Sequence, residues 1–208
     1  DMASWDTSLV TDMSSLFLNK GSFNQDISMW NVSKVTNMGA MFRSASNFNQ
    51  DLSRWDVSKV TNMGGMFYHA YRFNQDLSSW NVGEVTNMAS MFDYAANFNQ
   101  NLSRWNVGKV RNMNGMFAGA GKFNGDLSAW DVSKVTDMAW MFRQASAFNQ
   151  DLSRWDVSKV TGMSAMFESA TSFSANITGW VPASNVDSGY MFGGASEWFN
   201  AYTNCGYD

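Results

Sequence analysis

The side chains that most often carry out chemistry are scarce in this chain of 208 residues. It has one histidine, His69, and one cysteine, Cys205. A lone cysteine forms no disulfide and no thiolate metal site within the chain. The sequence offers no Ser-His-Asp set, no metal-ligand cluster and no phosphate-binding loop. It therefore predicts a non-catalytic protein that needs no cofactor.

Carboxylates recur at a fixed spacing along the chain. The members of this column are Asp26, Asp51, Asp76, Asp126 and Asp151, with Asn101 and Asn176 at equivalent positions. Stacked carboxylates repel one another, and calcium would relieve that repulsion. The alternative is that each Asp accepts a backbone N–H in an Asx turn. Because the neutral amide of Asn would weaken a cation site, we favour the turn and predict no metal.

Large aromatic and charged side chains occur close together in residues 68–72 and at the equivalent positions 93 and 94 of the next repeat. They are Tyr68, His69, Tyr71, Arg72, Asp93 and Tyr94. Tyrosine and arginine are typical of binding hot spots, and a cluster of exposed aromatic rings favours a partner that covers it. The sequence predicts a ligand-binding site here. The alternative is unselected drift on an outer surface.

A second candidate site consists of polar residues beside the expected core positions. It comprises Arg54, Arg104, Arg154, Asp56 and Asp156. Such columns could present a polar face to a peptide or a glycan. They could equally form a row of solvated side chains that pair with their neighbours, each pair contributing less than about 1 kcal/mol.

The element that must position all these residues is a repeat. Tryptophan recurs at one constant interval, without insertion or deletion, at positions 5, 30, 55, 80, 105, 130, 155 and 180. Such regularity indicates that each repeat is one coil of a stack. We assign residues 1–175 to seven regular coils and residues 176–208 to a C-terminal capping repeat and tail, because Pro182 and Ser188 depart there from the repeat pattern.

The spacing of apolar residues changes within each repeat. Trp55 and Val57 have strand spacing, whereas residues 63, 66, 67 and 70 have the spacing of one helix face. Asn62 and its equivalents precede this segment and suit a helix N-cap. The predicted fold is α/β: a right-handed leucine-rich-repeat-like solenoid of eight 25-residue coils, with one parallel sheet and a short helix per coil. Trp, Phe and Met would form interior columns, and Asn74 and its equivalents would form a hydrogen-bonded ladder.

The run Phe48-Asn-Gln-Asp-Leu-Ser-Arg-Trp-Asp-Val-Ser-Lys-Val-Thr-Asn-Met-Gly-Gly-Met-Phe67 resembles the BspA-like repeat of bacterial surface proteins. That repeat is a divergent leucine-rich repeat, and the match extends over nearly the whole chain. The resemblance implies an extracellular or cell-surface location and an adhesive or ligand-binding role, and it brings no catalytic residues.

The charge and hydropathy of the chain narrow the choice of partners. A net charge of −4 lacks the basic surface of a nucleic-acid binder, and no apolar run is long enough for a transmembrane segment. The predicted partner is an extracellular protein or glycan. The alternatives are a structural spacer rod and a glycan-, ice- or mineral-binding solenoid. An ice or mineral surface would use the regular threonine column that contains Thr36 and Thr61.

Overall fold

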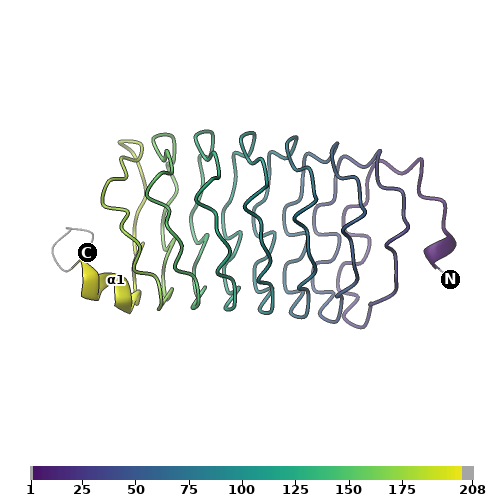
Figure 1. Ribbon diagram of the computed structural model, residues 1–208, viewed down its shortest axis with the longest axis horizontal. Coiled ribbons are helices and arrows are strands. Elements are labelled where there is room, and N and C mark those ends of the chain that lie inside the picture. The colour runs from purple at the N-terminus through teal and green to yellow at the C-terminus, as the bar shows by residue number, and fades with distance from the viewer. Residues whose placement is uncertain (1, 203–208) are drawn as a thin grey trace.

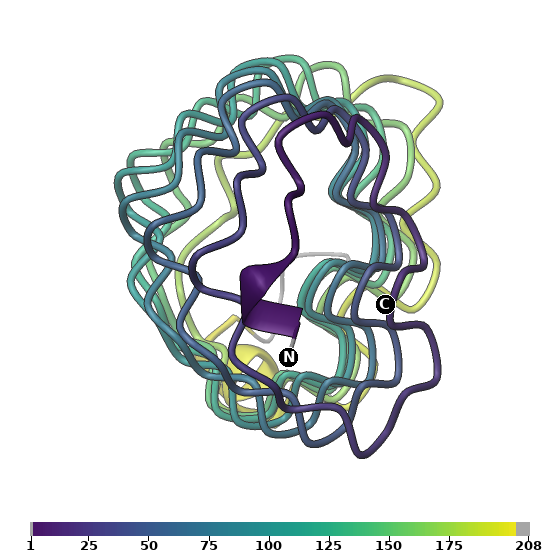
Figure 2. The ribbon, with the colours of Figure 1, turned by 90° about the vertical axis from the view of Figure 1, so that its right-hand side faces the viewer.

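The structure is a computed structural model that describes residues 2–202. The chain winds through a stack of coils, with its two ends at opposite ends of an elongated molecule (Figure 1). Viewed along the stack, the coils lie over one another and enclose a common interior (Figure 2). Parallel β-bridges join the same position of successive coils, from Asp12–Asn37 to Gly162–Asp187, and so link eight coils. We number them one to eight from the N-terminus, with coil one ending at Gln25.

The predicted short helix in every coil is wrong. Within residues 2–202 the helices are η1 (Met2–Ser4) and α1 (Ser196–Ala201), at the two ends of the stack. The segment expected to be helical contains two residues with positive φ in every coil, such as Gly65 at 62° and His69 at 56°. A right-handed helix requires negative φ at each residue, so neither position can belong to one.

Hydrogen bonds between coils replace the expected helical ones. The N–H of Met63 donates to the carbonyl of Asn87 at 3.0 Å, and the N–H of His69 donates to that of Asp93 at 2.7 Å. Between these, the N–H of Met66 closes a turn onto the Met63 carbonyl at 3.1 Å. Successive tight turns place apolar residues three and four apart on one side, as a helix does, and this is why the spacing misled the prediction.

The predicted parallel sheet is also wrong. In the described residues the coils are joined by isolated bridges, one at each step of the stack, and not by strands. The repeated turns interrupt the extended backbone before a second bridge can form beside the first. The α/β leucine-rich-repeat-like class therefore does not apply. The molecule is a stack of turn-rich coils.

The predicted interior columns of aromatic residues are confirmed. Trp80 and Trp105 stack with ring centroids 6.5 Å apart, and Phe92 and Phe117 stack at 5.7 Å. The indole N–H of Trp105 donates to the carbonyl of Leu77 at 2.9 Å, so burial of the ring leaves no unpaired donor there. The same bond recurs in six further coils. Trp5 differs, because it is 55% exposed at the N-terminal end of the stack.

Polar columns form turns, as the sequence indicated for the Asp column. The Asp51 carboxylate accepts the N–H of Ser53 at 2.8 Å, and its equivalents do the same. Asn62 accepts the N–H of Gly64 at 3.0 Å. The predicted helix N-cap at Asn62 is therefore wrong, although its side chain performs similar hydrogen bonding in an Asx turn.

The asparagine ladder is present. The side-chain oxygen of Asn49 accepts the backbone N–H of Asn74 at 2.9 Å, and the bond repeats from Asn24 to Ser174. This ladder fixes the corner of each coil on the corner of the preceding one.

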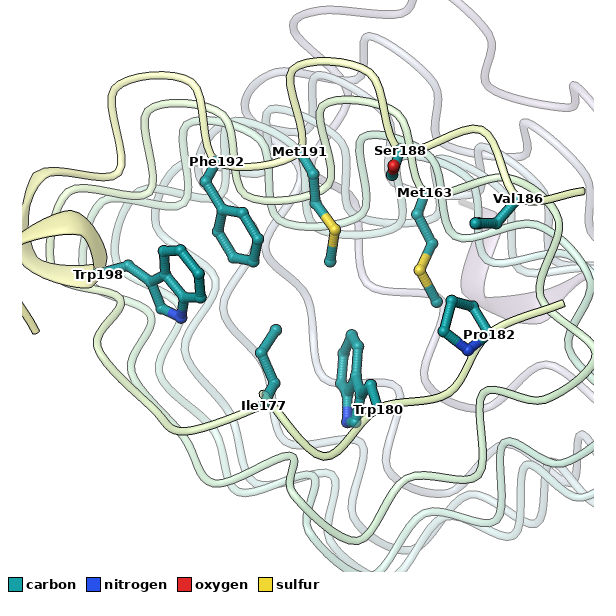
Figure 3. A pocket seen from close by; sticks show the side chains of 9 residues that line it. All are labelled: Met163, Ile177, Trp180, Pro182, Val186, Ser188, Met191, Phe192 and Trp198. Carbon is teal, nitrogen blue, oxygen red and sulfur yellow. The ribbon is translucent and has the colours of Figure 1, made fainter. Parts of the chain in front are cut away.

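The last coil differs from the others. Ser188 occupies the column that holds methionine in every other coil, and Pro182 occupies a valine position. A cavity of about 40 Å³ remains in the interior, and Figure 3 shows the side chains of Met163, Met191 and Trp180 around it. Beyond it Trp198 of α1 stacks on Phe192 with centroids 3.8 Å apart. Cys205 lies outside the described residues.

Candidate functional site

The structure brings the predicted aromatic cluster together. The rings of Tyr68 and His69 stack with centroids 4.2 Å apart, and Tyr94 meets His69 edge-on at 5.0 Å. The ring centroid of Tyr71 lies 5.4 Å from that of His69. The guanidinium of Arg43 lies 4.5 Å above the centre of the Tyr68 ring, in cation–π geometry.

Tyr94 crosses the neighbouring coil because that coil has a glycine beneath it. A Cβ atom at Gly119 would lie 2.7 Å from Cδ1 of Tyr94, so any other residue there would force the tyrosine ring to move. Across this glycine the Tyr94 hydroxyl donates to Oε1 of Gln144, at 3.0 Å and two coils away. Coil five therefore forms a low floor between higher side chains of coils four and six.

A hollow of about 330 Å³ lies over this floor. We call it the Tyr94 hollow. Its floor comes from coil five, its first wall from coils three and four, and its second wall from coil six. The lining residues are Tyr68, Ser90, Asp93, Tyr94, Asn114, Gly115, Ala118, Gly119, Trp140, Arg143 and Gln144.

The acid of the Tyr94 hollow is Asp93. Its Oδ2 accepts the hydroxyl of Ser90 at 3.2 Å, whereas its buried Oδ1 accepts no hydrogen bond from the described residues. Burial raises the pKa of Asp93 to about 6, against the opposing effects of the Ser90 hydrogen bond and of the charges on Arg143 and Arg43. A carboxyl with this pKa changes from protonated to ionised as the pH rises through about 6.

The second wall carries the opposite charge. Nε of Arg143 lies 2.6 Å from Oε2 of Glu168, which holds the guanidinium in place. Next to it, Trp140 is 49% exposed although it is one of the largest side chains in the protein. The Tyr94 hollow thus combines exposed aromatic rings with one acid and one base.

Three of the predicted residues lie beside the Tyr94 hollow and do not line it. His69 packs between tyrosine rings, and burial, with the nearby charge of Arg43, lowers its pKa. Tyr71 is 43% exposed, and Arg72 is exposed with its backbone N–H bonded to the Ser46 carbonyl at 3.3 Å. These residues support the first wall or extend its rim.

The second predicted site is spread along the stack. Arg54, Arg104 and Arg154 lie in coils three, five and seven, all exposed. The Asp56 carboxylate accepts the N–H of Ser58 at 3.1 Å, and hydrogen bonds with Ser58 lower the pKa of Asp56. Asp156 has the same arrangement with its own serine. Each acid is thus engaged in its local turn.

The sequence interpretation missed the floor and the second wall. Trp140 stands at a position that is Ser, Ala or Gly in six of the other coils, with Tyr190 as the other large residue. Gly119 belongs to a second column, which varies from coil to coil and holds Tyr94 and Gln144 in the neighbouring coils. Comparing these two positions through all eight coils would have drawn attention to both residues.

Two alternative site chemistries can be compared with the geometry. The threonine hydroxyls are engaged within the stack: that of Thr61 donates to the Thr36 carbonyl at 3.1 Å. Within residues 2–202, no group of three or more His, Cys, Asp or Glu side chains is placed to hold a metal ion.

Neither η1 nor α1 has the length or the apolar character to cross a lipid bilayer.

Comparison with known proteins gives a family without an assigned activity. The family described as "Mycoplasma protein of unknown function, DUF285" matches residues 1–105 and again residues 94–205. No curated protein matches the chain. Among solved structures, one from the Toll–Spatzle complex of Drosophila is similar at 10% identity with a TM-score of 0.34. The match covers 70% of this chain and 21% of that one. So distant a likeness supports no conclusion about fold or function.

Proposed function

We propose that this chain, which belongs to the DUF285 family, is a non-catalytic recognition module displayed outside the cell, and that it binds its ligand in the Tyr94 hollow. The observation that carries the proposal is the composition of this hollow. Tyr68, Tyr94 and Trp140 line it together with Asp93 and Arg143, above a floor of small residues. Ligand sites in proteins typically combine aromatic surface with a few polar groups in this way.

The repeat itself supports a selected role for this surface. Most columns are nearly constant from coil to coil, and they serve stacking or turn formation. Among the columns that vary, one holds Trp140 and Tyr190 among small residues, and another holds Tyr94, Gly119 and Gln144 in three successive coils. Of these residues, Trp140, Tyr94, Gly119 and Gln144 all line the one hollow. Exposed aromatic side chains carry a risk of aggregation, which a partner that covers them removes.

The proposed location outside the cell rests on the resemblance to BspA-like surface repeats. The match to a repeat family of unknown function is compatible with it and adds no location of its own. The absence of catalysis is proposed because the one histidine of the chain, His69, lies among tyrosine rings and does not line the hollow.

The test is binding of the intact chain to a panel of immobilised glycans and extracellular-matrix proteins. We expect the double variant Tyr68→Ala, Tyr94→Ala to lose binding while its melting temperature stays within a few degrees of the parent. The control is Arg54→Ala, Arg104→Ala, which removes exposed charges outside the hollow and should bind normally. Loss of binding in the control alone would place the site on the arginine and aspartate columns.

A structural spacer is the second candidate function, and the elongated shape of the stack favours it (Figure 1). A spacer needs only length and stability, so no surface variant should change any interaction. Failure of the intact chain to bind any member of the panel would support this alternative.

A further inference from the structure

We infer that the ligand of the Tyr94 hollow is a neutral saccharide, with a sugar ring against the indole of Trp140 and its hydroxyls bonded to the polar side chains around the floor. The inference rests on the proposed function and names its ligand class. Charge, hydrogen-bonding capacity, aromatic surface and size each favour this class.

The charges in and around the hollow oppose an ionic ligand of either sign. A cation would approach Arg143, and it would find the face of Tyr68 already occupied by the guanidinium of Arg43 at 4.5 Å. An anion would approach Asp93 and also Glu168, which lies 2.6 Å from Arg143. A neutral ligand avoids both repulsions.

The polar groups of the hollow include both acceptors and donors. Oδ2 of Asp93 and Oε1 of Gln144 each accept one hydroxyl, from Ser90 and Tyr94, and each has a second lone pair. The Asn114 amide donates to Asp137 and Arg143 pairs with Glu168 through Nε, and both side chains have further N–H groups. A sugar hydroxyl both donates and accepts. Neighbouring hydroxyls on one ring can therefore bond to an acid on one side and to a guanidinium or amide on the other.

The aromatic side chains of the hollow suit the apolar face of a sugar ring. The C–H groups of a sugar ring form an apolar face, and a half-exposed indole is a flat partner for it. Trp140 is 49% exposed and Tyr94 is 36% exposed. At about 330 Å³ the hollow lies near the lower end of the range for small-ligand sites, roughly 300–1,000 Å³. That volume suits one or two sugar rings.

A peptide ligand fits less well, because the backbone at this surface is already used. The N–H groups of Ser90 and Tyr94 donate to the Asn114 and Ala118 carbonyls, each at 2.7 Å, and that of Gly119 donates to the Arg143 carbonyl at 2.7 Å. An extended peptide that binds by strand addition needs unpaired backbone groups along an edge. The hollow lies in the middle of the stack, where the neighbouring coils take up these groups.

The experiment probes the intact chain with an array of immobilised neutral glycans that end in glucose, galactose, mannose, N-acetylglucosamine or N-acetylgalactosamine. Sialylated and sulfated glycans and matrix proteins form separate arms. We expect binding to at least one neutral glycan, with competition by the free methyl glycoside of its terminal sugar.

The deciding variant is Trp140→Ala, with Tyr190→Ala as its matched control. Both residues occupy the same position of the repeat with similar φ, 59° and 57°, and Tyr190 is 85% exposed outside the hollow. Alanine already occupies this position at Ala40 and Ala165, so the substitution is compatible with folding. Trp140→Ala should weaken glycan binding by at least about tenfold, and Tyr190→Ala should not change it.

The outcomes separate this inference from the proposed function. Binding confined to matrix proteins or charged glycans, and lost in Trp140→Ala, would overturn the saccharide inference and leave the hollow as the ligand site. Neutral-glycan binding that Trp140→Ala leaves unchanged would overturn the inference and the placement of the site. No binding in any arm would overturn the saccharide inference and the proposed function together.

Discussion

Single residues have different functions in this protein according to their column. Trp105 is 3% exposed, stacks on a tryptophan on either side, and pairs its indole N–H with the Leu77 carbonyl. We expect Trp105→Ala to lower the free energy of unfolding by about 3–5 kcal/mol, since it leaves a cavity in the middle of the core. Urea denaturation monitored by circular dichroism measures the effect.

The control for that variant is Lys109→Ala. Lys109 pairs with Glu84 at 2.7 Å, but both side chains are about half exposed, at 51% and 53%. Exposed ion pairs contribute about 0–1 kcal/mol, so this variant should unfold close to the parent. Equal urea midpoints for the two variants would contradict the assignment of Trp105 to the core.

Asp93 predicts a pH effect. Burial raises its folded pKa to about 6, above its ordinary value of 3.8, against the Ser90 hydrogen bond and the charges of Arg143 and Arg43. Between these two pH values the folded state binds more protons than the unfolded state. The free energy of unfolding contributed by this group is therefore highest below pH 4 and decreases as the pH rises through 6.

The comparison that isolates this effect is the parent against Asp93→Asn, by urea denaturation at pH 7 and at pH 5. The parent should gain stability relative to the variant at the lower pH, because the variant cannot titrate at this position. A difference between the two proteins that is the same at both pH values would show that Asp93 has an ordinary pKa.

At the scale of elements, the turns define the chain's path and shape the hollow. Gly119 and Gly194 occupy the same repeat position, with φ of 63° and 72°. Alanine at either position should cost about 1 kcal/mol for the left-handed backbone. Gly119→Ala should cost more, because its Cβ would meet the ring of Tyr94 at 2.7 Å, whereas a Cβ at Gly194 lies 3.4 Å or more from its neighbours. Urea denaturation and near-ultraviolet circular dichroism of the tyrosines distinguish the two. Equal losses would mean that Tyr94 does not lie over Gly119.

The last coil predicts a stabilising substitution. Ser188 stands in the methionine column, and a cavity of about 40 Å³ lies beside it. Ser188→Met should raise the free energy of unfolding by about 0.5–2 kcal/mol by filling that space. Ser184→Met, at an exposed position of the same coil, should give no gain. Thermal melts of both variants provide the measurement, and a lower melting temperature for Ser188→Met would show that the cavity cannot accept the side chain.

Sequence periodicity predicted the stack, its 25-residue register and its interior, because burial imposes a residue type at each core position. It did not predict the local backbone. Met63, Met66, Phe67 and Ala70 fit a helix face, but they fit two consecutive turns equally well, and the positive φ at His69 has no unmistakable residue signature. Glycine takes this conformation at Gly65, Gly115, Gly119 and Gly194, whereas the remaining positions hold Ser, Ala, Asn, His, Tyr, Trp or Gln.

The candidate site was predictable in part for a related reason. The first wall lies within two neighbouring repeats, and its large side chains are recognisable as departures from the pattern. The second wall is formed by Trp140 and Arg143 of coil six, which are about two repeats away in sequence. The two walls face one hollow because coil five, which lies between them, has glycine at positions 115 and 119. This arrangement depends on the order of the coils in the stack and cannot be recognised in any single repeat.

The molecule as a whole should unfold from its ends, because the backbone hydrogen bonds between coils join each coil to its direct neighbours. Coil one has a neighbour on one side among the described residues, and its Trp5 and Leu16 are 55% and 44% exposed, whereas the equivalent residues of coil five are buried. Coil five is hydrogen-bonded on both sides: the N–H of Phe117 donates to the Met141 carbonyl of coil six, and the N–H of Arg111 donates to the Thr86 carbonyl of coil four. Local opening requires less free energy where fewer buried contacts must be broken. We therefore expect amide hydrogens of residues 2–25 to exchange with deuterium well before those of residues 101–125, as measured by mass spectrometry under native conditions. Equal protection of the two coils would show that the stack opens only as one cooperative unit.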